Sequence, residues 1–212
     1  MESPALARAT RPIDTVLFDL GAVLIDWDPR YLYRPLFRGD EQAMEDFLTR
    51  IVPPDWNRSI DAGKTFDEAV AERIAAHPEH ADLITLWKAE WAKMLKGPID
   101  GSVEILAELR ERGYRLLALT NWSAETFPIA RERFGFLQWF EDIVVSGEVG
   151  LAKPDPRIFA LAIERCRLQP DRTLFIDDAP RNVEAGRAAG LNALQFIAPG
   201  KLRGDLVDLG LI

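Results

Sequence analysis

Four polar signals in the sequence each follow a short apolar segment. They are Asp19, the pair Thr120 and Asn121, Lys153, and the pair Asp177 and Asp178. Taken singly, each has an ordinary structural explanation: a turn former, a helix cap, a solvated charge or a polar loop. Charged and hydrogen-bonding side chains of these types also bind ions and polar ligands. Their order along the chain predicts that they converge on one ligand-binding site.

The segments that must position these residues alternate between strand and helix. Five apolar segments predict strands, at residues 13–19, 114–120, 142–146, 173–178 and 192–197. Helical spacing of apolar residues fills the gaps, at 102–112, from about 126 to 134, at 156–166 and at 181–189. Alternation of this kind predicts an α/β fold with right-handed crossovers and a three-layer parallel sheet. In such sheets ligands bind beyond the carboxyl ends of the strands, where the four polar signals lie.

One long segment interrupts the alternation. Residues 26–97 read as wholly helical and contain four tryptophans: Trp27, Trp56, Trp87 and Trp91. We interpret this segment as a helical cap domain inserted after the first strand, with most of its tryptophans in the core of a small bundle. The α/β core then comprises residues 13–25 and 98–212, and residues 1–12 are expected to form a flexible tail.

Composition limits the class of protein. The 212 residues are 48% hydrophobic and 28% charged, as in ordinary globular proteins. The net charge of −8 disfavours binding to nucleic acid. The single cysteine, Cys166, excludes an internal disulfide. Because no apolar run reaches the roughly 20 residues of a membrane span, we expect a cytoplasmic protein that does not enter membranes. We expect it to be a monomer or a homodimer.

Four ordered motifs resemble the haloacid dehalogenase superfamily, a large group made mostly of phosphatases. The motifs are FDLGAVL at 18–24, LTNWS at 119–123, GLAKPDPRIF at 150–159 and FIDDAPRNVEAG at 175–186. The resemblance covers nearly the whole chain and implies a Rossmann-like core with a helical cap. The first motif, of the form FDLG-x-V, is similar to that of sugar-1-phosphate phosphatases within the superfamily. The implied partner is a small phosphorylated metabolite.

The resemblance implies a nucleophile and a metal site. Asp19 corresponds to the nucleophile that forms an aspartyl-phosphate. Asp19, Asp178 and the backbone carbonyl of Gly21 correspond to ligands of Mg²⁺, and Asp177 is expected to hold a metal-bound water. Three crowded carboxylates without a cation would repel one another, which supports the metal.

The remaining motif residues correspond to groups that bind the substrate. The hydroxyl of Thr120 and backbone N–H groups at Thr120 and Asn121 would donate hydrogen bonds to the phosphate oxygens. Lys153 would neutralise charge on Asp19 and on the transferring group. Trp27 and Trp122 directly follow core motifs, and both are predicted to face the substrate cavity.

The sequence departs from the common phosphatase pattern at one position. Most phosphatases of the superfamily carry a second aspartate two residues after the nucleophile, which protonates the leaving oxygen and later activates water. Gly21 stands there instead. General acid–base catalysis contributes about 10²–10⁴-fold to a rate. We hypothesise that Asp26, Asp28 or a metal-ordered water takes over part of this role; Asp26 and Asp28 are equally explained as cap or turn residues.

Three functions are compatible with this departure. The favoured one is a Mg²⁺-dependent phosphatase for a small phosphomonoester such as a sugar phosphate, whose hemiacetal leaving group depends less on an acid. The second is a 2-haloacid dehalogenase, because those relatives also lack the second aspartate; however, they work without metal and lack the paired aspartates found at 177 and 178. The third is a binding module that keeps the fold without turnover.

Overall fold

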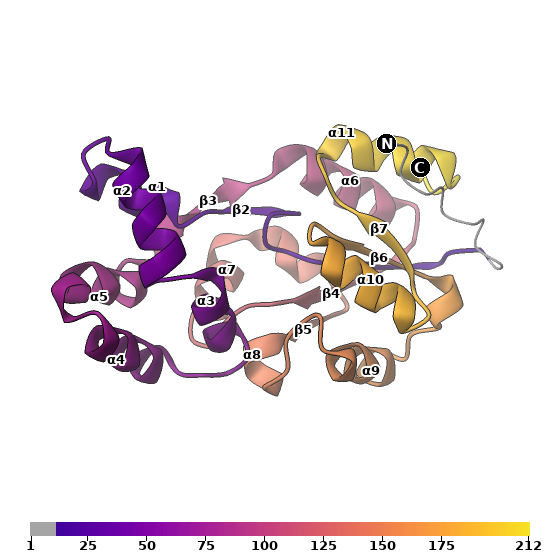
Figure 1. Ribbon diagram of the computed structural model, residues 1–212. Helices are drawn as coiled ribbons and strands as arrows, with labels where there is room; N and C mark the ends of the chain where they lie inside the picture. The colour runs from indigo at the N-terminus through magenta and orange to yellow at the C-terminus, as the bar shows by residue number, and fades with distance from the viewer. Residues whose placement is uncertain (1–11) are drawn as a thin grey trace.

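The computed structural model describes residues 12–212, so most of the tail predicted at 1–12 lies outside the described residues. A five-stranded parallel sheet forms the centre of the core (Figure 1). Its strand order is β5-β4-β1-β6-β7. The strands are β1 (Thr15–Phe18), β4 (Arg115–Thr120), β5 (Asp142–Val145), β6 (Thr173–Asp177) and β7 (Asn192–Gln195). The predicted parallel α/β sheet is confirmed, with each strand ending within two residues of its expected bound.

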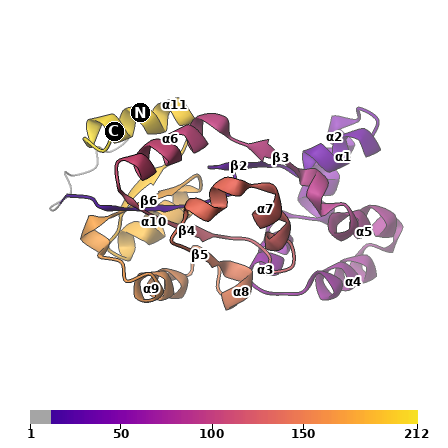
Figure 2. The same cartoon turned by 180° about the vertical axis from the view of Figure 1, so that it is seen from behind.

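Helices cover both faces of this sheet. Side chains of β1 alternate between the faces: Val16 and Phe18 pack in one apolar cluster and Leu17 in the other. The first cluster includes residues of α6 (Asp100–Glu111), α7 (Phe127–Arg133) and α11 (Pro199–Asp208). The second includes residues of α9 (Pro156–Arg165) and α10 (Pro180–Ala188). Viewed from behind, α6 and α11 lie on one side of the strands and α9 on the other, which makes three layers (Figure 2).

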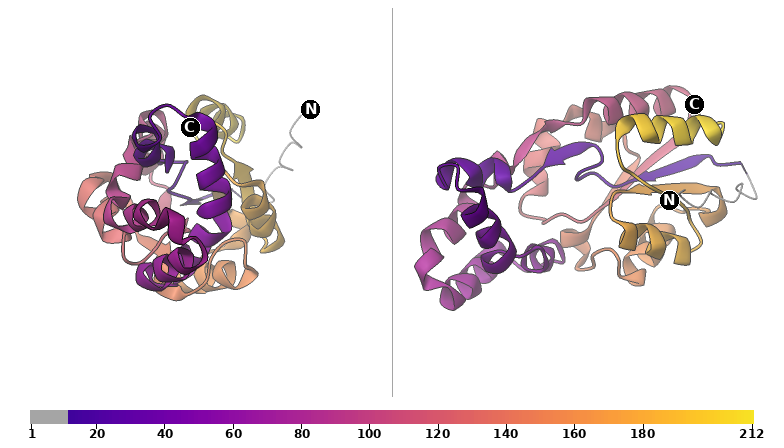
Figure 3. Two further views of the ribbon diagram at one scale, coloured as in Figure 1. Left: turned by 60° about the vertical axis from the view of Figure 1, so that its left-hand side comes forward. Right: turned by 45° about the horizontal axis from the view of Figure 1, so that its top comes forward.

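A helical insert follows β1 and lies beyond one end of the sheet (Figure 3). It contains α1 (Arg30–Leu36), α2 (Glu41–Asp46), the π-helical η1 (Phe47–Ile51), α3 (Pro54–Asp61), α4 (Phe66–Ala76), η2 (Pro78–His80), α5 (Ala81–Ala89) and η3 (Trp91–Met94). Short elements of the core complete the chain: η4 (Gly135–Trp139), α8 (Ser146–Val149) and η5 (Pro170–Arg172).

The expectation that residues 26–97 are wholly helical is wrong at both ends of the segment. There, β2 (Ile25–Trp27) and β3 (Leu95–Pro98) form a two-stranded antiparallel ribbon. The chain leaves the core and returns to it side by side, so the backbone groups of the two crossings satisfy each other across the ribbon. This pairing is a long-range contact that helical periodicity does not report.

Tryptophans form the centre of the insert, as expected. Trp87 is buried, with its ring 5.2 Å from that of Trp56, 5.9 Å from Tyr33 and 6.5 Å from Trp27. Tilted and edge-on contacts of this kind add to the free energy gained by burying the rings. The bundle therefore holds the elements of the insert, α3 included, against one aromatic centre.

Three polar contacts tie the insert to the core at the carboxyl ends of the strands. The hydroxyl of Ser146 donates to the carbonyl of Asp61 and accepts from the N–H of Trp122. The Glu125 carboxylate accepts from the N–H of Phe66 at 2.8 Å. The Arg133 guanidinium donates to two carbonyls within β3. The insert is therefore closed over the sheet edge. Within the described residues, none of the helices has the length and apolar character that crossing a membrane requires.

A glycine allows the closest approach between α8 and the loop after β4. A Cβ at Gly147 would lie 2.5 Å from the backbone nitrogen of Ala124 and 2.8 Å from the carbonyl oxygen of Trp122. We expect Gly147→Ala to lower the free energy of unfolding by about 1–3 kcal/mol, because backbone atoms cannot move aside as a flexible side chain can. Urea unfolding measures this change. The control is Gly204→Ala on α11, where a Cβ meets open space and stability should rise by about 0.8–1 kcal/mol. Equal stability of the two variants would contradict the close approach.

Candidate active site

Three carboxylates meet where β1 and β6 end. Phe18 and Ile176 are paired in the parallel ladder, so the residues that follow them, Asp19 and Asp177, emerge side by side. The N–H of Asp19 donates to the carbonyl of Ile176 at 2.8 Å, which extends the ladder to the site. Asp178 follows on the same loop. One oxygen from each of the three aspartates lies within 4.8 Å of the others. The predicted convergence of carboxylates at one sheet edge is therefore present.

The Lys153 ammonium lies between two of these carboxylates. Its Nζ is 3.1 Å from Oδ2 of Asp19 and 2.6 Å from Oδ2 of Asp177, and its side chain has no exposure to solvent. Asn121 holds the lysine backbone: its Oδ1 accepts from the Lys153 N–H at 2.8 Å and its Nδ2 donates to the Lys153 carbonyl at 2.9 Å. The Asn121 side chain is therefore committed to positioning Lys153, and a phosphate contact from Asn121 would come from its backbone.

Both carboxylate oxygens of Asp177 accept hydrogen bonds. Oδ1 accepts from the Ala179 N–H at 2.9 Å and from Nδ2 of Asn182 at 3.0 Å. Oδ2 accepts from Lys153 and, at 3.1 Å, from the same Asn182 amide. Asp177 thus anchors the lysine, and its expected hold on a metal-bound water stays a prediction. Asn182 was not singled out in the sequence, although it is a polar residue in the first turn of the helix that follows the paired aspartates.

Burial and charge shape the acidity of the cluster. Removal from water raises the pKa of Asp19 to about 7; Lys153 acts against this rise, and the neighbouring Asp177 and Asp178 add to it. Burial also raises the pKa of Asp178, and the charge of Asp177 adds to that effect. For Lys153, burial acts to lower the pKa, but the two carboxylates outweigh it and the pKa is raised. One lysine thus offsets part of the negative charge of three aspartates.

The donor set fits a hard divalent cation. Carboxylate oxygens are the ligands that Mg²⁺ prefers, and the cluster carries more negative charge than Lys153 neutralises. Asp19 and Asp178, together with Gly21, also line the same cavity, so a cation bound there would face a substrate. Asp19, Asp178 and the Gly21 carbonyl remain the residues proposed to hold it.

Thr120 offers a hydrogen-bond donor at the same sheet edge. It ends β4, the strand next to β1, and is fully buried. Within residues 12–212 its hydroxyl oxygen has no hydrogen-bond partner. A buried hydroxyl without a partner is costly unless a ligand supplies one. This observation supports, without testing, the predicted contact between Thr120 and a phosphate oxygen.

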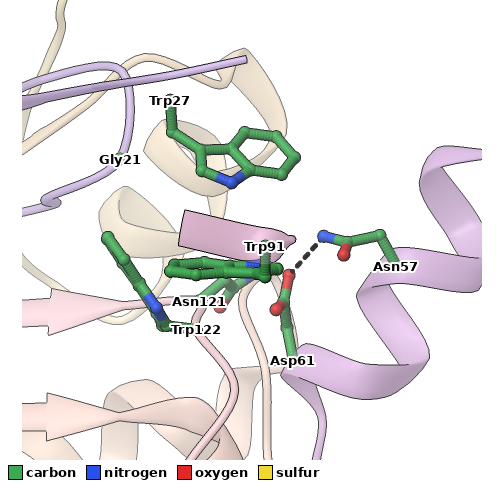
Figure 4. Close-up of a pocket in the computed structure, with 7 residues that line it drawn as sticks. All are labelled: Gly21, Trp27, Asn57, Asp61, Trp91, Asn121 and Trp122. Carbon is green, nitrogen blue, oxygen red and sulfur yellow. Dashed lines mark hydrogen bonds between the residues drawn. The ribbon is translucent and has the colours of Figure 1, made fainter. Parts of the chain in front are cut away.

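A cavity of about 440 Å³ lies between the core and the insert. Its core wall includes Asp19, Gly21, Asn121 and Asp178, and its other wall includes Trp27, Asn57, Arg58, Asp61 and Trp87. A smaller space of about 80 Å³ adjoins it and shares several of these residues; Trp91 and Trp122 complete its lining (Figure 4). The structure thus places Trp27 in the walls of both spaces and Trp122 in the wall of the smaller one. Their contact with a substrate stays a prediction.

The aspartates considered as substitutes for the missing acid form hydrogen bonds where the chain enters the insert. Both oxygens of Asp26 accept from the Tyr31 hydroxyl, at 2.8 and 2.9 Å. Asp28 accepts from the backbone N–H of Arg30 at 2.8 Å and from its guanidinium at 3.2 Å. Neither aspartate is among the described residues that line the two cavities. The geometry thus favours their explanation as cap and turn residues.

A different carboxylate lines both cavities. Asp61 ends α3, and its Oδ2 accepts from Nδ2 of Asn57 at 3.0 Å. Sequence reasoning missed both residues, because α3 carries no motif and only the folded insert brings its end over the strand edge. Figure 4 shows the Asp61 carboxylate pointing from the helix end towards the indoles of the smaller cavity.

Comparison with known proteins agrees with this architecture. The family of haloacid dehalogenase-like hydrolases matches residues 13–190. The chain is 27% identical over 185 residues to pyrophosphatase PpaX of Bacillus velezensis, covering 84% of this chain and 80% of the relative. It is 26% identical to the N-acetylmuramic acid 6-phosphate phosphatase of Pseudomonas aeruginosa, covering 84% of this chain and 79% of that protein. The chain therefore belongs to the haloacid dehalogenase-like hydrolases and has distant phosphatase relatives.

Solved structures share the fold. A haloacid dehalogenase family enzyme from Bacteroides thetaiotaomicron, in complex with magnesium and inorganic phosphate, superposes with a TM-score of 0.67 and 24% identity, covering 88% of this chain and 95% of that one. The L-2-haloacid dehalogenase of Xanthobacter autotrophicus superposes with a TM-score of 0.61 and 18% identity, covering 92% and 83%. A phosphate-bound enzyme and a haloacid dehalogenase thus both share this arrangement of sheet and helical insert.

The buried lysine gives a testable consequence for stability. We expect Lys153→Met to lower the free energy of unfolding by about 3–5 kcal/mol at neutral pH, because it leaves Asp19 and Asp177 buried without their cation. Chemical denaturation without added metal measures the change. The control Lys201→Met removes an exposed pair with Asp205 and should change stability by about 0–1 kcal/mol. A similar small effect of both substitutions would mean that the buried pairing contributes little.

Proposed function

We propose that this protein is a Mg²⁺-dependent phosphatase that hydrolyses a small phosphomonoester through an aspartyl-phosphate on Asp19. The observation that carries the proposal is Lys153, buried between Asp19 and Asp177 with Asp178 beside them. This arrangement joins a nucleophile, a fixed cation and surplus carboxylate charge for a metal. The named phosphatase relatives support the same reaction class.

The proposed roles follow from position. Asp19 Oδ attacks phosphorus, while Lys153 keeps the carboxylate oriented and faces the charge that the phosphoryl group brings. The unpartnered hydroxyl of Thr120 donates to a phosphoryl oxygen. Mg²⁺, when bound by Asp19, Asp178 and the Gly21 carbonyl, supplies neutralisation of the phosphoryl charge. Asn121 and Asn182 act as positioning residues, because they hold Lys153 and Asp177 respectively.

The cavity favours a small leaving group that carries hydroxyls. A space of about 440 Å³ admits a metabolite but not a macromolecule. The indole N–H groups of Trp27 and Trp122 are buried and have no partner within the described chain, so both can donate to a ligand. Asp61 can accept from a hydroxyl, and indole faces suit the apolar faces of a sugar ring. A sugar phosphate combines these features.

Released products distinguish the phosphatase from the dehalogenase. We expect Mg²⁺-dependent release of phosphate from p-nitrophenyl phosphate and α-glucose-1-phosphate, lost when EDTA removes the metal. We expect no chloride release from 2-chloropropionate, because the surplus carboxylate charge at Asp177 and Asp178 suits a metal cation, which would in turn bind a phosphoryl group. Metal-independent chloride release would contradict the proposal and favour the dehalogenase. Phosphate measured by a coupled assay and chloride measured by ion chromatography provide the two readouts.

Substitution of the nucleophile tests its assignment. Asp19→Asn should lower kcat on p-nitrophenyl phosphate by about 10³-fold or more, because the amide cannot form the phosphoryl ester. Circular dichroism and thermal unfolding should show that the variant still folds. The control Asp208→Asn removes an exposed carboxylate at the end of α11 and should keep the wild-type rate. Substantial activity of the Asp19→Asn variant would remove Asp19 from the role of nucleophile.

A further inference from the structure

The position of the missing acid borders an open space. An ideal Cβ at Gly21 would have no neighbouring atom within 4 Å. Gly21 and Asp61 both line the space of about 80 Å³ between core and insert (Figure 4). A carboxylate from the insert therefore lines the same space as position 21, where the core carries no side chain.

Contacts with both parts of the molecule hold Asp61 in this place. Its backbone carbonyl accepts from the Ser146 hydroxyl, which itself accepts from the N–H of Trp122. Its carboxylate accepts from the Asn57 amide one turn earlier on α3. Asp61 is therefore fixed from the core through its backbone and from the insert through its side chain, while the second carboxylate oxygen, Oδ1, is left for other partners.

Burial at the cavity wall brings the pKa of Asp61 close to neutral pH. Burial raises its pKa to about 7, and Arg58 on the same helix acts against this rise. Arg58 is itself paired with the exposed Asp55 at 2.8 Å. Other charged residues are on the elements packed against α3: Glu148 is on α8, and Asp67, Glu68, Glu72 and Arg73 are on α4. The charged residues that line the larger cavity are Asp19, Arg30, Asp178 and Arg181. A group of this acidity can both give and take a proton near pH 7.

We propose that Asp61 is the general acid and base of the reaction, supplied by the insert in place of a residue at position 21. In the first step an Asp19 oxygen bonds to phosphorus, the bond from phosphorus to the leaving oxygen breaks, and the Asp61 carboxyl gives its proton to that oxygen. In the second step the Asp61 carboxylate takes a proton from water as the water oxygen bonds to phosphorus. Phosphate leaves, and Asp19 returns as a carboxylate and Asp61 as a carboxylic acid.

The proposal rests on the proposed phosphatase function and adds a role for the contact between the insert and the core. Because Asp61 reaches the cavity only from the end of α3, the acid and the nucleophile belong to different parts of the molecule. The hydrogen bond from Ser146 of the core to the Asp61 carbonyl joins the two parts beside the cavity. Protonation of the leaving group would then depend on this contact between the insert and the core.

Leaving-group dependence separates an acid from a structural residue. An acid matters most for a poor leaving group and little for one that departs as a stable anion. The experiment compares wild type, Asp61→Asn and the control Asp55→Asn, with Mg²⁺, on p-nitrophenyl phosphate, phenyl phosphate and glycerol 3-phosphate. Asp55 is on the same helix, but its side chain is 83% exposed and outside both cavities.

For Asp61→Asn we expect a fall in kcat of about 10²–10⁴-fold on glycerol 3-phosphate, an intermediate fall on phenyl phosphate, and less than about tenfold on p-nitrophenyl phosphate. Asp55→Asn should match wild type on all three. The rate of wild type on glycerol 3-phosphate should also fall as pH rises above about 7, because Asp61 loses the proton it must give, and this fall should be absent in Asp61→Asn. Activity on p-nitrophenyl phosphate shows that the variant is folded.

Two results would overturn the proposal. Equal loss on all three substrates means that Asp61 acts through the shape of the cavity, and no loss on glycerol 3-phosphate means that the proton comes from elsewhere. Failure of the proposed function is distinguishable from both, because wild type itself would then release no phosphate from any of the three substrates. If Asp61→Asn fails to fold, Asp61→Ser tests the same dependence with a smaller side chain.

Discussion

A buried lysine between two buried carboxylates is the interaction on which the site depends. Charges removed from water are tolerated only when they are paired and hydrogen-bonded. Lys153 meets this condition through Asp19 and Asp177, and each partner has a further anchor in the backbone or in Asn182. The parallel order that places β1 between β4 and β6 is what brings these residues from distant parts of the chain to one point. Surplus negative charge remains at that point, and a divalent cation is the partner that suits it.

The helical insert makes this strand edge one wall of a cavity. Its tryptophans serve two purposes. Trp56 and Trp87 hold the bundle together, while Trp27 and Trp87 also line the larger cavity beside the carboxylates and Trp91 lines the smaller space. Contacts such as that of Ser146 with Asp61 join the walls, so the chemistry of the core and the shape of the insert are linked. In this arrangement a change in the insert can reshape the cavity without touching Asp19.

Gly21 makes the contact between the insert and the core relevant to the proposed chemistry. Because Gly21 carries no side chain, the core offers no proton-exchanging group at this position beside Asp19 and Lys153. Asp26 and Asp28 are close to Gly21 in sequence, yet they accept hydrogen bonds from Tyr31 and Arg30 where the chain enters the insert. Asp61 is 40 residues further along the chain than Gly21 and lines the space over it. Proximity in sequence was thus a poor guide to which carboxylate lines this space, because the insert folds back over the core.

Local patterns in the sequence were sufficient for much of the architecture. Apolar runs that end in Asp19, Thr120 and Asp177 predicted strands and one polar edge, because parallel strands bring their carboxyl ends together. Four features depended on the tertiary structure. They are the β2–β3 ribbon, the pairing of Lys153 with Asp177, the hydrogen bonds of Asn121 to the lysine backbone and the position of Asp61. All four are contacts between residues far apart in the chain, and hydrophobic periodicity reports only which face of an element is buried. The sequence by itself determined which chemical groups reach the strand ends, and the tertiary structure decided which partners they meet.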